Sequence, residues 1–331
     1  MVMGAKRSTK QRIQYYIGRL KVLQLELINI RDSIKLIIES KCKSNDEFSN
    51  QCLMSRFYFA VANKLIQMIS AIESMDPQSI LLATRYVLEL LINLKLLEKD
   101  RDYIYCIYKE LIEQYIKFVK IQIEKTKREM GILEQLNRVE HEILQEALIP
   151  LIKKTVRELN KSDDIKEHIV QELLLLLPRT FMKAVDRFAE KEFLLYSEDA
   201  KHMGYGFTAY QLREKGLPEL ERKLKELQEY ENNFYSHVES MNIHLDNLCN
   251  NAPKTWKDKA RITGLEEDYN IIYHHTSSIL HATPASVMHE RILEDAEIYI
   301  FIRYLYVRMY DTTELIRKVI AEFKAGLNSV K

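Results

Sequence analysis

Residues 76–98 read DPQSILLATRYVLELLINLKLLE and contain one of the most apolar segments of the chain. Asp76 followed by Pro77 is typical of a helix N-cap with proline at the first helical position, so a helix is predicted to begin here. Around that helix, leucine, isoleucine and valine side chains cover nearly the whole circumference, which indicates a helix buried on all sides. Because only neighbouring helices or a sheet can bury it, the segment predicts a large hydrophobic core.

The composition favours helices as the neighbours. The 331 residues include only 8 glycines and 6 prolines, about half the usual share, and a sheet-rich fold needs more turn residues than that. Hydrophobic residues at 47% and charged residues at 29% are enough for a sizeable core. The sequence therefore predicts an all-α multi-helix bundle with long antiparallel helices and no sheet, and it excludes β-sandwiches, collagen and intrinsic disorder.

Helix start and stop signals divide the chain further. We predict a basic N-terminal helix in residues 1–45, a helical domain in 46–310 with long central helices in 101–160, and a C-terminal helix in 311–331. The glycine-rich loop 201–207 is the best candidate for a flexible connection. The individual helices are predicted at 8–41, 46–74, 77–98, 101–129, 130–160, 163–177, 179–200, 218–249, 255–262, 264–281, 284–310 and 312–327.

The cysteines and the apolar runs bear on the compartment. Cys42, Cys52, Cys106 and Cys249 form no CxxC pair, so we predict four isolated thiols that pack as small core residues. No apolar run approaches the ~20 residues of a membrane-spanning helix, and no apolar segment follows the basic N-terminus as in a signal peptide. We therefore expect a cytoplasmic protein with no membrane contact.

Positive charge is concentrated at the N-terminus. The net charge is +1, but residues 1–43 hold ten Lys/Arg against three acidic residues, which is +7 and leaves −6 for the rest. A basic first helix can follow a phosphate backbone, and the candidate nucleic-acid-binding residues are Lys6, Arg7, Lys10 and Arg12. The alternative is a solvated helix face that docks on an acidic body.

A polar seam interrupts the apolar helix of residues 77–98. Arg85, Glu89 and Asn93 follow one another at i, i+4 and i+8 and so share one face. A charge in a buried helix must be paired or must meet a polar ligand. The seam is therefore either an internal Arg85–Glu89 ion pair that fixes the packing, or an arginine directed at a substrate phosphate.

The second unusual segment is the predicted helix 264–281. Four of the nine histidines lie within the 16 residues from His274 to His289, and His281 falls at the helix C-terminus, where the macrodipole favours imidazolium. This would suit acid–base chemistry, although a solvated, capping histidine is the alternative. His274 and His275 point about 100° apart, so a shared metal ion is disfavoured. Phosphate-loop, GxSxG and HExxH motifs are absent, and we predict no metal or other cofactor.

Two of these segments together resemble the motifs of a known protein family. Arg85-x3-Glu89, followed far downstream by Tyr269-x3-Tyr273-x3-Ser277-x3-His281, resembles the signature of a bacterial all-helical family catalogued as a domain of unknown function. Trp256 and Gly264-Leu265 also stand where that family places a tryptophan and a Gly-Leu pair. In outline the resemblance covers residues 46–310.

That family is distantly similar to HEPN-type domains of toxin–antitoxin and phage-defence systems, many of which are metal-independent ribonucleases. The resemblance implies a common site that contains five catalytic candidates: Arg85, Glu89, Tyr273, Ser277 and His281. HEPN nucleases place an arginine five to seven residues before the histidine, and here those positions hold Thr276, His275 and His274. Either His274 replaces that arginine, Arg85 supplies it from another helix, or the domain is not a nuclease.

Two functions remain as hypotheses. The first is an RNA-directed domain of the ribonuclease kind, in which His281 acts as acid or base and Arg85 stabilises phosphate charge. The second is a non-enzymatic interaction module, in which the seam is a buried polar network and the helices of residues 101–160 bind a protein partner or a second copy.

Overall fold

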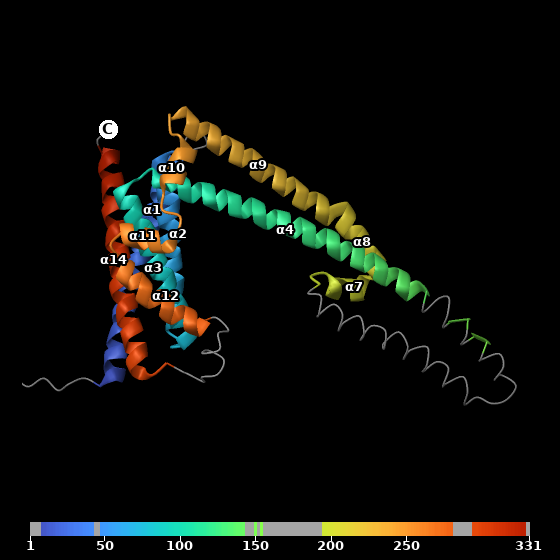
Figure 1. The fold of residues 1–331 in the computed structure, drawn as a ribbon, viewed down its shortest axis with the longest axis horizontal. Coiled ribbons are helices and arrows are strands. Elements are labelled where there is room, and N and C mark those ends of the chain that lie inside the picture. The colour runs from blue at the N-terminus through green and yellow to red at the C-terminus, as the bar shows by residue number, and fades with distance from the viewer. Residues whose placement is uncertain are drawn as a thin grey trace, which may run out of the picture. The chain divides into compact units, whose positions relative to one another are not determined.

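The computed structural model describes residues 8–42, 47–142, 149–150, 153–154, 194–280 and 293–328 (Figure 1). All regular structure in these residues is helical and they contain no strand, which confirms the predicted all-α fold. The chain divides into two compact units, Met1–Glu110 with Phe234–Lys331, and Leu111–Asn233. The elements are α1 (Thr9–Lys41), α2 (Asn50–Ile72), α3 (Pro77–Lys99), α4 (Tyr103–Glu140), α7 (Ser197–Met203), α8 (Tyr205–Gln211), the π-helical turn η2 (Leu212–Gly216), α9 (Leu217–Ser240), α10 (Leu245–Asn251), α11 (Trp256–Ile262), α12 (Glu266–Leu280) and α14 (Asp295–Asn328).

Helix α3 forms the centre of the first unit. It packs against α2, α11, α12 and α14, and its apolar side chains are buried nearly all round, as predicted, with Leu82 as an exposed exception. The Asp76 carboxylate caps the helix by accepting the Ser79 amide at 2.7 Å. The Ser79 hydroxyl and amide together hold the pKa of Asp76 below its ordinary value. The N-cap read from the sequence is confirmed.

Helix α1 packs along α2 and α14 through a regular apolar row. Ile13, Leu20, Leu27 and Ile34 recur every seventh residue and all are buried. This spacing keeps the row on one side of the helix and is the pattern by which long helices pack side by side. The opposite side is exposed and carries polar residues together with the apolar side chains of Val22, Leu25 and Leu36, so α1 covers the core with one face and meets solvent with the other.

Three helix boundaries differ from the predicted ones. Helix α4 runs without a break through residues 129–130, and α14 runs without a break through residue 311. Conversely, the predicted helix 218–249 is interrupted after Ser240, because Asn242 adopts a left-handed backbone with φ 59°. Asparagine tolerates that conformation better than most residues, so it ends one helix and redirects the chain into α10.

In the second unit, the C-terminal half of α4 lies beside η2 and the beginning of α9. Lys127 of α4 pairs with Glu221 of α9 at 3.5 Å, and Glu134, farther along α4, pairs with Arg213 of η2, which directly precedes α9. Residue numbers rise along α4 as they fall along the other segment, so the two run antiparallel. The fully buried Glu129 accepts the amide of Leu195 at 2.8 Å. A small apolar core holds the unit together and consists of Leu133, Ala200, Tyr205, Ala209 and Leu212.

The loop predicted as a flexible connection is instead a tight helix junction. Gly204 has φ 94° and separates α7 from α8, a conformation that glycine adopts without a side-chain clash. The Gly206 amide donates to Asn137 Oδ1 at 3.1 Å, and a Cβ at Gly206 would lie 2.6 Å from that oxygen. Gly204 is therefore favoured by its backbone conformation and Gly206 by its close approach to Asn137, and the prediction of a flexible loop is wrong.

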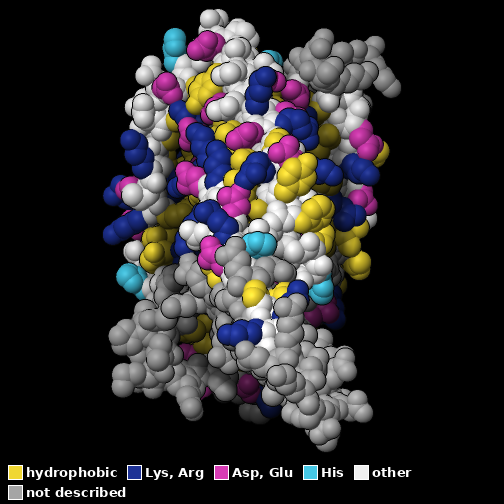
Figure 2. Space-filling model, turned by 90° about the vertical axis from the view of Figure 1, so that its right-hand side faces the viewer, with side chains coloured by type: hydrophobic (Ala, Val, Ile, Leu, Met, Phe, Trp, Pro, Cys, Tyr) yellow, Lys and Arg dark blue, Asp and Glu magenta, His cyan; other side chains and the backbone are white. Residues whose placement is uncertain are grey.

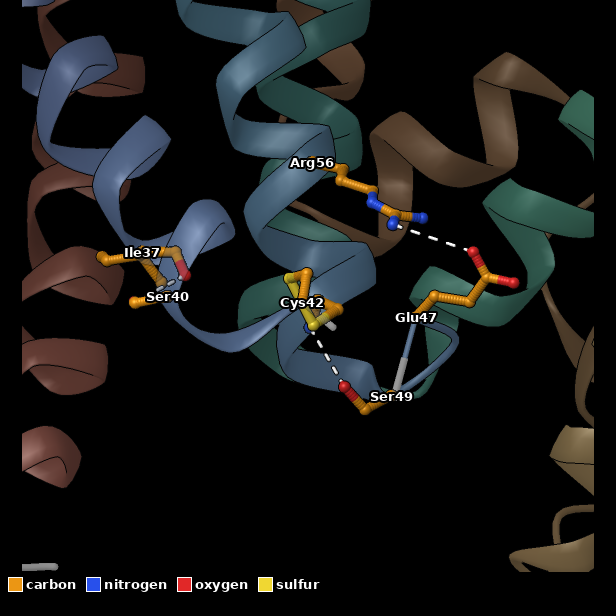
Figure 3. The surroundings of a disulfide bond; sticks show 7 residues. Ile37, Ser40, Cys42, Glu47, Ser49 and Arg56 are labelled. Atoms are coloured by element: carbon orange, nitrogen blue, oxygen red, sulfur yellow. Dashed lines mark hydrogen bonds and ion pairs between the residues drawn. A yellow bond between two sulfur atoms is a disulfide. The ribbon is translucent and has the colours of Figure 1, made fainter. Parts of the chain in front are cut away.

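All four cysteines are paired, which contradicts the prediction of isolated thiols. Cys42 at the end of α1 bonds to Cys52 in the first turn of α2 (Figure 3), and Cys106 of α4 bonds to Cys249 of α10. The Cα–Cα distances of 5.5 and 5.4 Å lie in the usual range for disulfides. Their separations of 10 and 143 residues give no sequence signal, because packing alone brings the thiols together.

No helix in the described ranges is both long enough and apolar enough to span a membrane.

Candidate functional site

Helices α3 and α12 bring three of the predicted site residues into contact. The Arg85 guanidinium lies over the Tyr273 ring, 4.7 Å from its centroid, and Arg85 Nε donates to Glu89 Oε1 at 3.1 Å. The Tyr273 ring is stacked in turn on the Tyr269 ring, with centroids 5.1 Å apart and planes tilted by 23°. Residues nearly two hundred positions apart in sequence therefore form one cluster, which we call the Arg85 cluster.

The Arg85 guanidinium is fixed on one edge and open on the other. Its Nε faces Glu89, and its plane lies on the tyrosine ring, but among the described residues neither terminal Nη group donates a hydrogen bond. The Arg85 and Glu89 side chains are 27% and 23% exposed. An ion pair at such exposure contributes little stability, ~0–1 kcal/mol. The arrangement therefore leaves a two-donor edge available to a ligand.

Two buried polar atoms lie on the same two helices. Ser277, one turn beyond Tyr273 on α12, has a buried Oγ with no hydrogen-bond partner in the described part of the chain. Asn93, two turns beyond Arg85 on α3, likewise has a buried, unpartnered Oδ1. An unpartnered buried polar group costs ~1–3 kcal/mol. Such atoms mark places where water or a ligand group can be accommodated.

Burial affects the tyrosine behind Tyr273. Partial burial, together with the neighbouring Tyr273 hydroxyl and Glu89, raises the pKa of Tyr269, while Arg85 opposes the shift. Tyr269 therefore keeps its proton at neutral pH and supplies a neutral aromatic surface beneath the stack.

The histidines of α12 do not act together in the described residues. His274 is exposed and meets the Tyr273 ring edge-on, whereas His275 packs on Phe301 and lies 3.9 Å from Glu297. These different neighbours follow from the 100° step between adjacent helix positions. His281 lies outside the described residues, so its catalytic role stays a prediction. The described part holds no cluster of three metal-ligating side chains.

Sequence reasoning missed a second polar cluster, between α12 and α14. Asp268 forms an ion pair with Arg308 Nη2 at 2.7 Å and accepts a hydrogen bond from the Tyr304 hydroxyl at 3.0 Å. Arg308 Nη1 also pairs with Asp311 at 2.9 Å. Burial and the adjacent Asp268 carboxylate raise the pKa of Tyr304. The spacing Tyr304-x3-Arg308-x2-Asp311, which puts the three residues on one helix face, could have indicated this cluster. It was overlooked because Asp311 also resembles a helix cap.

The predicted basic residues of the N-terminus are partly described. Lys6 and Arg7 lie outside the described residues, while Lys10 and Arg12 are exposed in the first turns of α1. The Arg12 guanidinium lies 5.8 Å from the centroid of the Tyr299 ring of α14. Arg12 forms no ion pair with any described residue, so this part of α1 meets tyrosine rather than an acidic surface.

Elsewhere the surface charges are mixed. On the face drawn in Figure 2, Lys and Arg side chains alternate with Asp and Glu, with hydrophobic side chains between them. A pocket at the C-terminal end of α3, lined by residues that include Leu96, Tyr103 and Leu248, contains none of the predicted site residues.

Comparison of the chain with protein-family models, with curated proteins and with solved structures found no match. The resemblance to the bacterial helical family therefore stays a prediction, and function must be inferred from the chain's own side chains.

Proposed function

We propose that this protein is an RNA-directed helical domain of the toxin or phage-defence kind, in which the Arg85 cluster binds a backbone phosphate. The observation that carries the proposal is the open edge of the Arg85 guanidinium. An arginine held at Nε and stacked on a ring presents its two terminal amino groups in the geometry of two phosphate oxygens. Partial burial strengthens such a contact, because surrounding water screens it less.

The residues also suit metal-independent RNA cleavage. In that reaction the 2′-hydroxyl attacks the adjacent phosphorus, the bond from phosphorus to the 5′-oxygen breaks, and protons leave the first oxygen and reach the second. Arg85 stabilises the charge that develops on the non-bridging oxygens. His281 transfers a proton, and Tyr273 and Ser277 orient the nucleotide.

Replacement of Arg85 tests this proposal. Arg85→Lys keeps the charge but loses the two-donor edge, so we expect RNA cleavage to fall about 100-fold, as for loss of one preorganised donor. His281→Ala is expected to abolish cleavage while leaving RNA binding unchanged. The measurement is cleavage of total RNA by purified protein, combined with growth and RNA integrity after induction in a bacterial host.

Arg56→Lys is the matched control for Arg85→Lys. Arg56 lies in the same unit, is 32% exposed and has a carboxylate neighbour, Glu47, at 4.0 Å. Its replacement should leave RNA cleavage unchanged. Equal growth and intact RNA with wild type, Arg85→Lys and His281→Ala, all folded and abundant, would contradict the ribonuclease proposal.

A second candidate function, an oligomerisation module, is favoured by one observation on α4. Leu111, Tyr115, Phe118 and Ile121 follow one another at helical spacing and are 39 to 56% exposed. Single exposed apolar residues are ordinary, but a contiguous row on one helix is typical of a protein-binding surface. In this proposal the row packs against the same row of a second copy.

Phe118→Glu tests the oligomerisation module. If the row joins two copies, the charge in its middle should convert a dimer to a monomer in sedimentation equilibrium. Lys117→Gln is the control, because it makes the same change in net charge on the neighbouring residue and off the row. A wild-type protein that is monomeric at all concentrations tested would rule this candidate out.

A further inference from the structure

Helices α1 and α14 join to form a surface of alternating tyrosine and arginine. The two helices pack side by side within the first unit (Figure 1). On α14 the residues lie at i, i+4, i+7 and i+11, and on α1 they lie at i, i+3, i+4 and i+7, so each set occupies one helix face. We call this the tyrosine–arginine surface; it consists of Arg12, Tyr15, Tyr16 and Arg19 of α1 and Tyr299, Arg303, Tyr306 and Tyr310 of α14.

The rings and guanidinium groups form a continuous network. The Tyr16 ring lies 6.1 Å from the Tyr299 ring and 5.6 Å from the Tyr306 ring. Arg12 covers Tyr299 at 5.8 Å, and Arg19 covers Tyr306 at 5.2 Å while its Nε donates to the Tyr306 hydroxyl at 3.0 Å. These contacts hold the inner rings in fixed positions.

The outer rings continue the network and are open to solvent. Tyr15 lies against Tyr16 at 5.2 Å and Tyr310 lies 6.3 Å from Tyr306. Tyr15 is 46% exposed and Tyr310 is 43% exposed. If the tyrosine–arginine surface served only to join α1 to α14, burying these rings would make the packing of the two helices more stable. Their exposure leaves aromatic area that a ligand can cover.

The arginines of this surface are not engaged in ion pairs with the described residues, although the Tyr306 hydroxyl and the nearby Glu26 both contribute to raising the pKa of Arg19. Arg12, Arg19 and Arg303 form no ion pair with any described residue, and the chain has no acidic residue before Glu26. Other arginines of the same helices are paired, for example Arg317 with Glu26 at 3.2 Å. Three guanidinium groups that form no ion pair, placed among exposed rings, are suited to a polyanion that also offers flat aromatic groups.

We propose that the tyrosine–arginine surface binds single-stranded nucleic acid, with bases stacked on the tyrosines and phosphates paired with the arginines. The surface extends ~16 Å along α14, from Tyr299 to Tyr310, which is room for about three nucleotides. A duplex is disfavoured as the occupant, because its bases are already stacked on one another and cannot reach the rings. This surface lies on other helices than the Arg85 cluster, and the proposal goes beyond phosphate binding there.

Fluorescence anisotropy with oligouridylate, oligodeoxythymidylate and a duplex RNA, each of about 10 nucleotides, tests the surface. We expect wild type to bind both single strands and to bind the duplex at least tenfold more weakly. A preference for the RNA strand would show that the 2′-hydroxyl is read, and equal affinity would show that stacking and phosphate contacts suffice. Wild-type protein that binds no single strand at low salt, or binds the duplex equally well, would overturn the proposal.

Variants assign the binding to these side chains. Tyr15→Leu with Tyr310→Leu should weaken binding about tenfold or more, and Arg303→Gln should weaken it and reduce its salt dependence by about one phosphate contact. Tyr210→Leu and Arg31→Gln are the controls, because Tyr210 of α8 is 56% exposed and lies outside this surface, and Arg31 of α1 is already paired with Asp32. Unchanged affinity in the surface variants would overturn the proposal.

The two proposals fail separately. Loss of RNA cleavage in Arg85→Lys with normal binding by the tyrosine variants would leave the phosphate site standing and remove the tyrosine–arginine surface. Weaker single-strand binding in the tyrosine variants, with no effect of Arg85→Lys on any RNA, would support the tyrosine–arginine surface and remove the phosphate site.

Discussion

Replacing Cys106 and Cys249 together with serine is expected to lower the free energy of unfolding by about 5 kcal/mol, the largest change of any substitution considered for this protein. The disulfide closes a ring of chain with a sequence separation of 143, and this ring contains the whole second unit. Opening the ring gives the unfolded chain many more conformations, so folding becomes less favourable. The measurement is guanidinium unfolding of both proteins without reductant.

The Cys42–Cys52 disulfide closes a much shorter ring and provides a comparison for the predicted loss of stability. Cys42 and Cys52 are separated by 10 residues, so their replacement should cost only about 3 kcal/mol on the same entropic argument. A wild-type unfolding midpoint that is identical with and without reductant would contradict both expectations. Titration of thiols in the protein as isolated from its own cell would also test the predicted cytoplasmic location, since disulfides persist mainly in oxidising compartments.

Arg308→Met is expected to destabilise the protein by about 1–2 kcal/mol, more than loss of an isolated ion pair of similar exposure, because Arg308 pairs with both Asp268 and Asp311. The Arg308 and Asp268 side chains are only 25% and 24% exposed, and Arg308 is the cationic partner of Asp268. Its loss would leave the Asp268 carboxylate with the Tyr304 hydroxyl but no charge to balance it. Because this contact joins α12 to α14, amide hydrogen exchange should also become faster in α12.

Arg303→Met is the control on the same helix. Arg303 is exposed and has no ion pair in the described structure, so its removal should change stability by less than about 0.5 kcal/mol. A double-mutant cycle with Asp268→Asn isolates the pair from the general effect of losing an arginine. If Arg308→Met were no more destabilising than Arg303→Met, the α12–α14 cluster would contribute nothing to stability.

Local sequence patterns were sufficient where the physics is local. The Asp76 cap depends on residues within one turn and the burial of α3 on the apolar side chains around a single helix, so spacing alone predicted both. The Arg85–Glu89 pair was one of two alternatives that the spacing left open. Helix ends were predicted less well, because one residue type serves several purposes. Asp311 has the chemistry of a cap but pairs with Arg308 within a continuous helix. Asn242 was read as helical, yet its left-handed backbone ends α9.

Everything that requires contact between distant segments was decided by the tertiary structure. The four cysteines appeared isolated, and packing placed them in two disulfides. In the sequence the tyrosines appeared scattered along the helices; the parallel packing of α1 and α14 gathers five of them around Arg12 and Arg19. The sequence alone determined that the chain folds into helices and which faces those helices bury, because hydrophobic periodicity depends only on residues that are close together in the chain. Which buried faces meet depends on side-chain fit summed over the whole core, and no single segment contains that information.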